Sequence, residues 1–360
     1  MDPEPRHDIS ESDRPSKSAK NLYRLKIAAA VFTFGGVALF AYFIYSIGLE
    51  ELIGGITRFG FAGFAVILAI YFLRMAVRAW AWSLSVYEPY YLKFRHTLSA
   101  VIIGEAISSL IPLGILASGT AKAVAVRDRV PLVVGLSSVS IENLFYSLVT
   151  SIFLIVGGVT LLRGFTVDDY WIVVIDILLA GTFALLVLLF LMVLRQWHFA
   201  SETCERLYKR GYFRRILENG RLDVRLFENL IYGFYRRYPG RFLPICLLEA
   251  AYHLLGIFEV WYILSRLSSS LPSVMASFLL ESVSRMITIL FKVVPFVIGV
   301  DEAGAQFVGV AVGLATGIGV TMAIIRKGRI IFWTLIGMLI VAKRGLSIRG
   351  LWNSKEANES

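Results

Sequence analysis

Charged residues lie within or beside several long apolar runs of this chain. A charge buried in a bilayer costs at least ~2.5 kcal/mol on insertion scales unless it is paired or hydrated. Such residues are therefore candidates for binding a charged ligand or for ion pairs between helices. Glu281 and Arg285 are four residues apart, so on a helix they would share a face and could pair. The charged residues of these runs are Glu105, Glu142, Glu249, Glu259, Glu281, Arg285, Lys292, Asp301 and Glu302.

The stretch VVPFVIGVDEAGAQ, residues 293–306, places two adjacent carboxylates next to helix-breaking residues. Pro295 removes a backbone donor, and Gly304 follows the carboxylates of Asp301 and Glu302. Irregular backbone is tolerated at membrane depth only where protein buries it or where it lines a wet cavity. We therefore expect a broken segment whose acids lie at the mouth of a groove. The alternative is that both acids simply lie at the membrane interface.

A second stretch, SSLIPLGILASGTAK (residues 108–122), has a similar pattern. It carries Pro112 and Gly114 at its centre and ends at Lys122, and Glu105 precedes the proline by two turns. Paired Gly/Pro interruptions in corresponding positions of two halves point to a transporter's binding site. The two halves could thus form an inverted repeat around one groove.

A third polar stretch, SSVSIEN (residues 137–143), ends in Glu142 and Asn143 inside an otherwise apolar run. These side chains could face the same groove. The alternative is that the serine hydroxyls serve helix packing, as small polar residues do in membranes.

The composition places all these positions in an integral membrane protein. The 360 residues are 57% hydrophobic and only 17% charged, with a mean hydropathy of +0.70. A spanning helix needs about 20 mostly apolar residues, and the alternating segments of a barrel are not found. Cys204 and Cys246 give neither a disulfide framework nor a zinc-ligand spacing, so we expect no metal site and no cofactor.

We predict an all-α polytopic protein with about seven or eight transmembrane helices and two broken or re-entrant segments, residues 98–121 and 274–304. Residues 1–26 form a disordered cytoplasmic tail, 27–342 the membrane domain, and 343–360 a polar C-terminal tail. The apolar runs are 27–47, 61–82, 98–117, 132–162, 171–194, 242–264, 274–300, 305–325 and 330–342.

Basic residues beside the runs set the expected orientation in the cell membrane. Those between residues 17 and 26 predict a cytoplasmic N-terminus. If the segment 98–121 dips in and returns, the basic residues at 74–95 and at 122–129 both stay cytoplasmic. The cluster formed by Arg326, Lys327 and Arg329 is assigned to the same side.

Residues 195–241 form a strongly basic stretch that we expect to be a cytoplasmic loop. Its charge could act only as a topology determinant, or it could contact anionic lipid headgroups or a partner protein. Nucleic-acid binding is not expected, because no recognisable binding motif accompanies the charge.

Four stretches of the sequence resemble one known family. They are GEAISSLIPLGILASGTAKAVAVRD (104–128), SSVSIENLFYSLV (137–149), PFVIGVDEAGA (295–305) and IIRKGRIIFWTLIG (324–337). They look like the membrane domain shared by lysylphosphatidylglycerol synthases and stand-alone flippase-like proteins, and the similarity covers most of the chain after residue 27. The resemblance implies movement of a charged or glycosylated lipid between leaflets, and some stand-alone members are linked to hopanoid or polyprenyl-lipid pathways.

The sequence also departs from that family. The family often has an acidic–basic pair where this chain reads Glu142-Asn143, and a glycine-rich turn where it reads Phe296-Val297-Ile298. The chain ends at Ser360 without the soluble aminoacyl-transferase domain that the synthases carry, so an enzyme of that type is not expected.

The resulting hypothesis is a lipid translocator of the cytoplasmic membrane, without catalytic residues. No Walker sequence occurs, so transport would be downhill or ion-coupled. The alternatives are a membrane-embedded transferase acting on a lipid, and a non-transporting scaffold for lipid-synthesis enzymes. The candidate groove residues are Glu105, Pro112, Lys122, Glu142, Asn143, Glu281, Arg285, Pro295, Asp301, Glu302 and Gly304.

Overall fold

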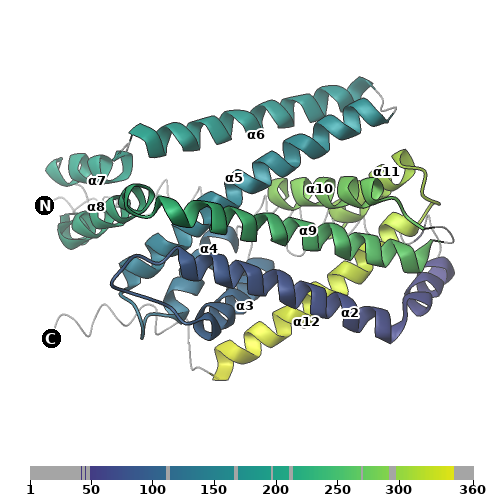
Figure 1. Ribbon diagram of the computed structural model, residues 1–360, viewed down its shortest axis with the longest axis horizontal. Helices are drawn as coiled ribbons and strands as arrows, with labels where there is room; N and C mark the ends of the chain where they lie inside the picture. Colours follow the sequence, from purple (N-terminus) through teal and green to yellow (C-terminus); the bar gives the residue numbers. More distant parts are fainter. Residues whose placement is uncertain are drawn as a thin grey trace, which may run out of the picture.

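The computed structural model describes residues 42, 45, 49–110, 114–165, 169–195, 198–210, 214–268, 271–291 and 297–343. The predicted N-terminal tail, nearly all of the predicted helix 27–47, both groove prolines (Pro112 and Pro295) and residues 344–360 lie outside these ranges. Every regular element in the described ranges is helical (Figure 1), so the all-α prediction is confirmed. The elements are α2 (Leu49–Leu84), α3 (Phe94–Leu110), α4 (Gly114–Ala125), α5 (Leu132–Gly164), α6 (Asp169–Arg195), α7 (Phe199–Lys209), α8 (Arg214–Arg237), η2 (Pro239–Arg241), α9 (Phe242–Leu267), α10 (Val274–Leu290), α11 (Val300–Ala311) and α12 (Ile318–Lys343).

Three of the described segments are long and apolar enough to span a bilayer by length and composition alone: Leu52–Leu84, Leu132–Gly164 and Pro239–Leu267. Helices are the expected element because the hydrocarbon core offers no partner for backbone N–H and C=O groups. The chain is thus a polytopic membrane protein. Inside α2, Gly60 has φ 69°, a left-handed value open to glycine, and it separates a short N-terminal piece from the long apolar part.

Two helical hairpins occupy the positions where the sequence predicts broken segments. α3 packs along α4, and α10 packs along α11. Small residues allow the close approach: a Cβ on Gly104 of α3 would lie 2.8 Å from Lys122 Cγ, and a Cβ on Gly304 of α11 would overlap Ile287 of α10. α12 supports both hairpins, since it packs against α3 and against α11.

The two hairpins begin at opposite ends of the molecule (Figure 1). α2 and α9 run side by side in opposite directions. At one end, next to the start of α3, Arg241 donates to the carbonyl of Val86 at 3.0 Å. At the other end, next to the start of α10, Arg58 donates to the carbonyl of Leu267 at 3.5 Å. The first hairpin therefore enters the helix bundle from one end and the second from the other.

Two boundary predictions are wrong. The runs 305–325 and 330–342 do not end at the basic cluster 326–329, because α12 continues through it as one helix. The true break is the turn after α11, where Gly313 and Gly317 have φ 79° and 90°. The basic side chains mark no helix end because they are buried and paired with acids inside the protein.

The basic stretch 195–241 is largely helical, where a loop was expected. α7 and α8 pack against each other, and α8 lies on α5 through buried Phe234, which contacts Phe145 edge to face. The exposed residues of α8 are mostly polar (Asp223, Arg225, Asn229, Arg236 and Arg237), with Leu222 and Leu226 among them. The charge of this stretch is therefore carried by an ordered amphipathic unit at the end where the first hairpin begins (Figure 1).

Candidate functional site

Described residues on either side of the two hairpin turns line one cavity of about 380 Å³. Each hairpin contributes residues next to its turn, and α2, α5, α6, α9 and α12 supply the walls. Its described lining residues are Tyr71, Arg78, Glu105, Ser108, Ser109, Ser118, Gly119, Lys122, Asn143, Tyr146, Ser147, Thr150, Ser151, Leu154, Thr182, Tyr252, Arg285, Thr288, Ile289, Val297, Asp301, Arg326, Arg329 and Ile330.

The lining is polar and carries a surplus of positive charge. Five of these residues are basic and two are acidic, which gives a formal charge of +3 for the described lining. Most of the remaining side chains are hydroxyl-bearing serines, threonines and tyrosines. Such a surface can replace the hydration of an anionic, hydroxyl-rich headgroup inside a membrane protein.

Arg78 of α2 joins the first hairpin to α5. Its Nη2 lies 2.6 Å from Glu142 Oε1, and its Nη1 lies 3.3 Å from Glu105 Oε1. The same guanidinium donates to Asn143 Oδ1 at 3.4 Å, and Lys122 Nζ lies 3.9 Å from Glu142 Oε2. Glu142 is therefore buried behind the wall as the shared anion, whereas Glu105, Lys122 and Asn143 line the cavity.

Glu281 of α10 is the anion of a second cluster. Its carboxylate accepts from Arg74 at 2.9 Å, from Arg285 at 3.0 Å and from Arg326 at 2.7 Å. The predicted pair of Glu281 with Arg285 is confirmed. Arg285 and Arg326 line the cavity, whereas Glu281 is fully buried and does not. Its ion pairs therefore fix these two arginines from the side that faces away from the cavity.

Glu259 of α9 completes this cluster. It pairs with Arg74 at 3.1 Å and with Arg329, and it lies 3.8 Å from Arg326. Four guanidinium groups thus share the two carboxylates of Glu259 and Glu281. Several of their donors, Arg285 Nε, Arg326 Nη1 and Arg329 Nε, are buried without a hydrogen-bond partner in the described part of the chain. The cluster retains positive charge and unused donor capacity beside the cavity.

The adjacent acids of α11 have different surroundings. Asp301 lines the cavity, and its Oδ1 accepts from Ser284 Oγ at 2.8 Å. Glu302 is fully buried, accepts from the backbone N–H of Gly299 at 2.8 Å, and lies 2.6 Å from Lys327 Nζ. Gly299 has φ 83°, so Glu302 stabilises the left-handed turn that begins α11.

The predicted groove residues fall into three groups. Glu105, Lys122, Asn143, Arg285 and Asp301 line the cavity, which their separation in sequence could not guarantee. Behind it lie three buried anions, Glu142, Glu281 and Glu302. Gly304 lies in the α10–α11 contact, whereas Pro112 and Pro295 are outside the described residues. Contact of any of them with a lipid remains a prediction.

Sequence reasoning missed the role of the basic residues. Arg74, Arg78, Arg326, Lys327 and Arg329 were interpreted as flanks that set orientation, yet all five are at most 8% exposed. A usable signal was present: Arg74 and Arg78 are four residues apart and Arg326 and Arg329 three apart, so each pair shares one helix face. Acids lie in the neighbouring apolar runs, and burying both charges as ion pairs costs less free energy than burying either charge alone.

His253 of α9 is a packing residue. Its Nε2 lies 3.0 Å from Thr150 Oγ1, and its ring stacks on Phe153 with centroids 4.5 Å apart. No group of three or more His, Cys, Asp or Glu residues in the described part of the chain is arranged to hold a metal ion.

A comparison with protein families assigns the sequence to a family. The model described as the lysylphosphatidylglycerol synthase TM region matches residues 25–337, a range that includes both hairpins and all the cavity-lining residues. A search of curated proteins and a search of solved structures found no significant match. The matched range covers most of the chain, which therefore belongs to the family of the lysylphosphatidylglycerol synthase TM region.

Proposed function

We propose that this protein is a flippase-like translocator of the cytoplasmic membrane, which moves a charged or glycosylated lipid, including the polyprenyl type, between leaflets. The observation that carries the proposal is the shared cavity, where two hairpins that enter from opposite ends meet. Family membership supports a role connected with membrane lipids.

The chemistry of the cavity suits a headgroup in transit. The basic surplus complements a phosphate, and the hydroxyls complement glycerol or sugar oxygens. Because most of the charges are already paired inside the protein, their attraction for a headgroup is moderated. A lipid can thus lose its water on entry and still leave, since tight binding to one state would stop transport.

The distribution of basic residues supports an orientation. The connections 85–93 and 126–131 and helices α7 and α8 carry exposed basic side chains, and all lie at the end where the first hairpin begins (Figure 1). The positive-inside rule assigns this end to the cytoplasm. The same rule places the N-terminus there, as the basic residues before residue 27 suggest.

Reconstitution tests the proposal. The purified chain is placed in vesicles with fluorescent phospholipid and polyprenyl-linked analogues, and the loss of leaflet protection is measured while lipid masses are followed. Protein-dependent exposure with unchanged lipid mass is the expected result. A new lipid mass would instead indicate a transferase, and neither effect over a broad lipid panel would favour the scaffold for lipid-synthesis enzymes.

A further inference from the structure

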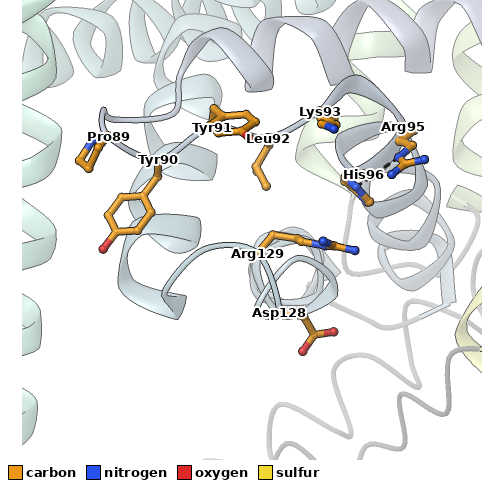
Figure 2. Close-up of a pocket in the computed structure, with 9 residues that line it drawn as sticks. All are labelled: Pro89, Tyr90, Tyr91, Leu92, Lys93, Arg95, His96, Asp128 and Arg129. Atoms are coloured by element: carbon orange, nitrogen blue, oxygen red, sulfur yellow. Dashed lines mark hydrogen bonds between the residues drawn. The ribbon is translucent and has the colours of Figure 1, made fainter.

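A second cavity, of about 370 Å³, lies at the base of the first hairpin and shares no residue with the one between the hairpin tips (Figure 2). It is formed by the α2–α3 connection, the first turn of α3 and the turn between α4 and α5. Its described lining residues are Pro89, Tyr90, Tyr91, Leu92, Lys93, Arg95, His96, Asp128 and Arg129. Neither the translocation cavity nor its ion-pair clusters account for these residues.

The charged groups of this pocket differ from those of the interior. Lys93, Arg95 and Arg129 are exposed, and none of them forms an ion pair with another residue that the structure describes. Arg95 Nε donates to His96 Nε2 at 3.3 Å, which leaves the outer nitrogens of its guanidinium for a ligand. In Figure 2 Arg129 extends toward Arg95 and His96, whereas the carboxylate of Asp128 points away from them. Three basic groups thus line one pocket, and the carboxylate of its one acid points away from Arg129.

The backbone around the pocket is held in place. Arg241 donates to the carbonyls of Leu84 and Val86 at 3.3 and 3.0 Å, and its Nη2 lies 2.5 Å from Glu88 Oε1. Leu92 is buried at 6% exposure and anchors the connection from inside. The basic groups are therefore presented by an ordered connection, which lowers the entropy lost on binding.

The location of the pocket indicates where its ligand lies. It adjoins the end of the spanning segment Leu52–Leu84, and Tyr90 and Tyr91 are 40% and 73% exposed beside the basic residues. Exposed tyrosines at the end of a spanning helix are typical of the headgroup level of a bilayer. The first turn of the 17-residue α3 adds the partial positive charge of a helix N-terminus to the same space.

We propose that this pocket binds a phosphate ester at the membrane surface, the group carried by the headgroup of an anionic phospholipid. Lys93, Arg95 and Arg129 supply the charge, and the tyrosines contact the glycerol region. The site is separate from the translocation cavity and would anchor an anionic lipid beside the base of the first hairpin. The proposal does not depend on lipid translocation, because binding here requires no passage through the protein.

Photolabelling tests the proposal on the purified full chain in neutral detergent micelles. The probe is phosphatidylglycerol with a photoactivatable group near its headgroup, and labelled residues are mapped by mass spectrometry. We expect labels within residues 89–96 and 128–129, reduced by unlabelled phosphatidylglycerol and not by phosphatidylcholine. Competition by soluble glycerol phosphate as well would show that phosphate chemistry suffices, and its failure to compete would show that the lipid is required. The first outcome supports a site for the phosphate itself, and the second supports a site for the whole anionic phospholipid.

Two variants sharpen the test. K93Q/R95Q/R129Q should bind phosphatidylglycerol about 100-fold more weakly, at about fivefold for each charge removed. K93R/R95K/R129K keeps the charge and should retain binding. The matched control R206Q/K209Q/R210Q removes three exposed charges from α7 and the residue that follows it, at the same end of the molecule (Figure 1). The proposal is overturned if no label maps to the pocket, or if the control loses as much affinity as the pocket variant.

Discussion

The two neighbouring acids of α11 show that adjacent positions can have separate roles. Asp301 lines the cavity near the start of α11, whereas Glu302 is fully buried, lies 2.6 Å from Lys327 Nζ and accepts from the backbone N–H of Gly299. Lys327 Nζ is farther from Asp301, at 3.9 Å from Oδ2. Sequence alone treats them as one pair at the mouth of a groove. Their side chains diverge because successive residues on a helix point about 100° apart, so only one can face the cavity.

Asp301→Asn and Glu302→Gln should therefore have different effects. Asp301→Asn removes a charge from the cavity wall and should lower lipid transport about tenfold or more, with little change in thermal stability. Glu302→Gln leaves Lys327 buried without its close partner and should lower the free energy of unfolding by a few kcal/mol, roughly 3–5 for a broken buried pair. Vesicle transport and thermal unfolding in detergent measure the two effects. Equal loss of stability in both variants would contradict the separation.

The ion-pair cluster around Glu281 can be tested by a single substitution. It holds Arg74, Arg285 and Arg326 together inside the protein, so Glu281→Gln would leave three guanidiniums around one neutral amide. We expect a loss of stability of roughly 3–5 kcal/mol. The control Glu202→Gln breaks an exposed pair with Arg206 on α7 and should cost no more than about 1 kcal/mol. Thermal unfolding of the two variants in parallel measures both losses of stability. Similar unfolding midpoints would show that the buried cluster contributes little to the stability of the protein.

Only some of the helix boundaries could be predicted from the sequence. The two broken segments could be predicted, because Pro112, Gly114 and Pro295 interrupt apolar runs. The continuous α12 could not, because a basic cluster within an apolar run also fits the end of a membrane helix. Its charges are compatible with a helix interior only because Glu259, Glu281 and Glu302 come from other helices. That pairing depends on tertiary structure, which local composition does not specify.

The close contact between α3 and α12 can be tested by adding one methyl group at Gly337. A Cβ on Gly337 of α12 would lie 2.5 Å from Ala106 Cβ and 2.8 Å from the carbonyl oxygen of Ile102, so Gly337→Ala must push α12 away from the first hairpin. We expect a loss of roughly 1–3 kcal/mol from overpacking. Gly181→Ala on α6 is the matched control, since nothing lies within 4 Å of its added Cβ. If both variants unfold at the same temperature, the packing of α12 on α3 is looser than described.

At the scale of the whole molecule, the opposed entry of the hairpins provides a way to expose one site to two sides. Each hairpin contributes residues next to its turn to the shared cavity and has its base at its own end of the bundle. A small displacement of one hairpin could open the cavity toward that hairpin's end while the other remains closed. Transport would then need no large rearrangement of α2 and α9, which pack along each other between the two ends. The buried ion pairs would have to be retained or exchanged during such a movement, because breaking one without replacement is costly.

This arrangement fixes which surface residues share a side of the membrane. Arg95 and Arg210 lie at the end where the first hairpin begins, and Leu271, 84% exposed, lies between α9 and α10 at the base of the second. In a background with Cys204 and Cys246 replaced, Leu271→Cys should react with a membrane-impermeant maleimide added to intact cells. Arg95→Cys and Arg210→Cys should react only after permeabilisation, because the positive-inside rule assigns their end, which carries the exposed basic residues, to the cytoplasm.

Labelling of Leu271→Cys and Arg210→Cys from one side would mean that the hairpins do not enter from opposite faces. The cavity would then open to a single leaflet, which is incompatible with translocation and compatible with an enzyme or a scaffold.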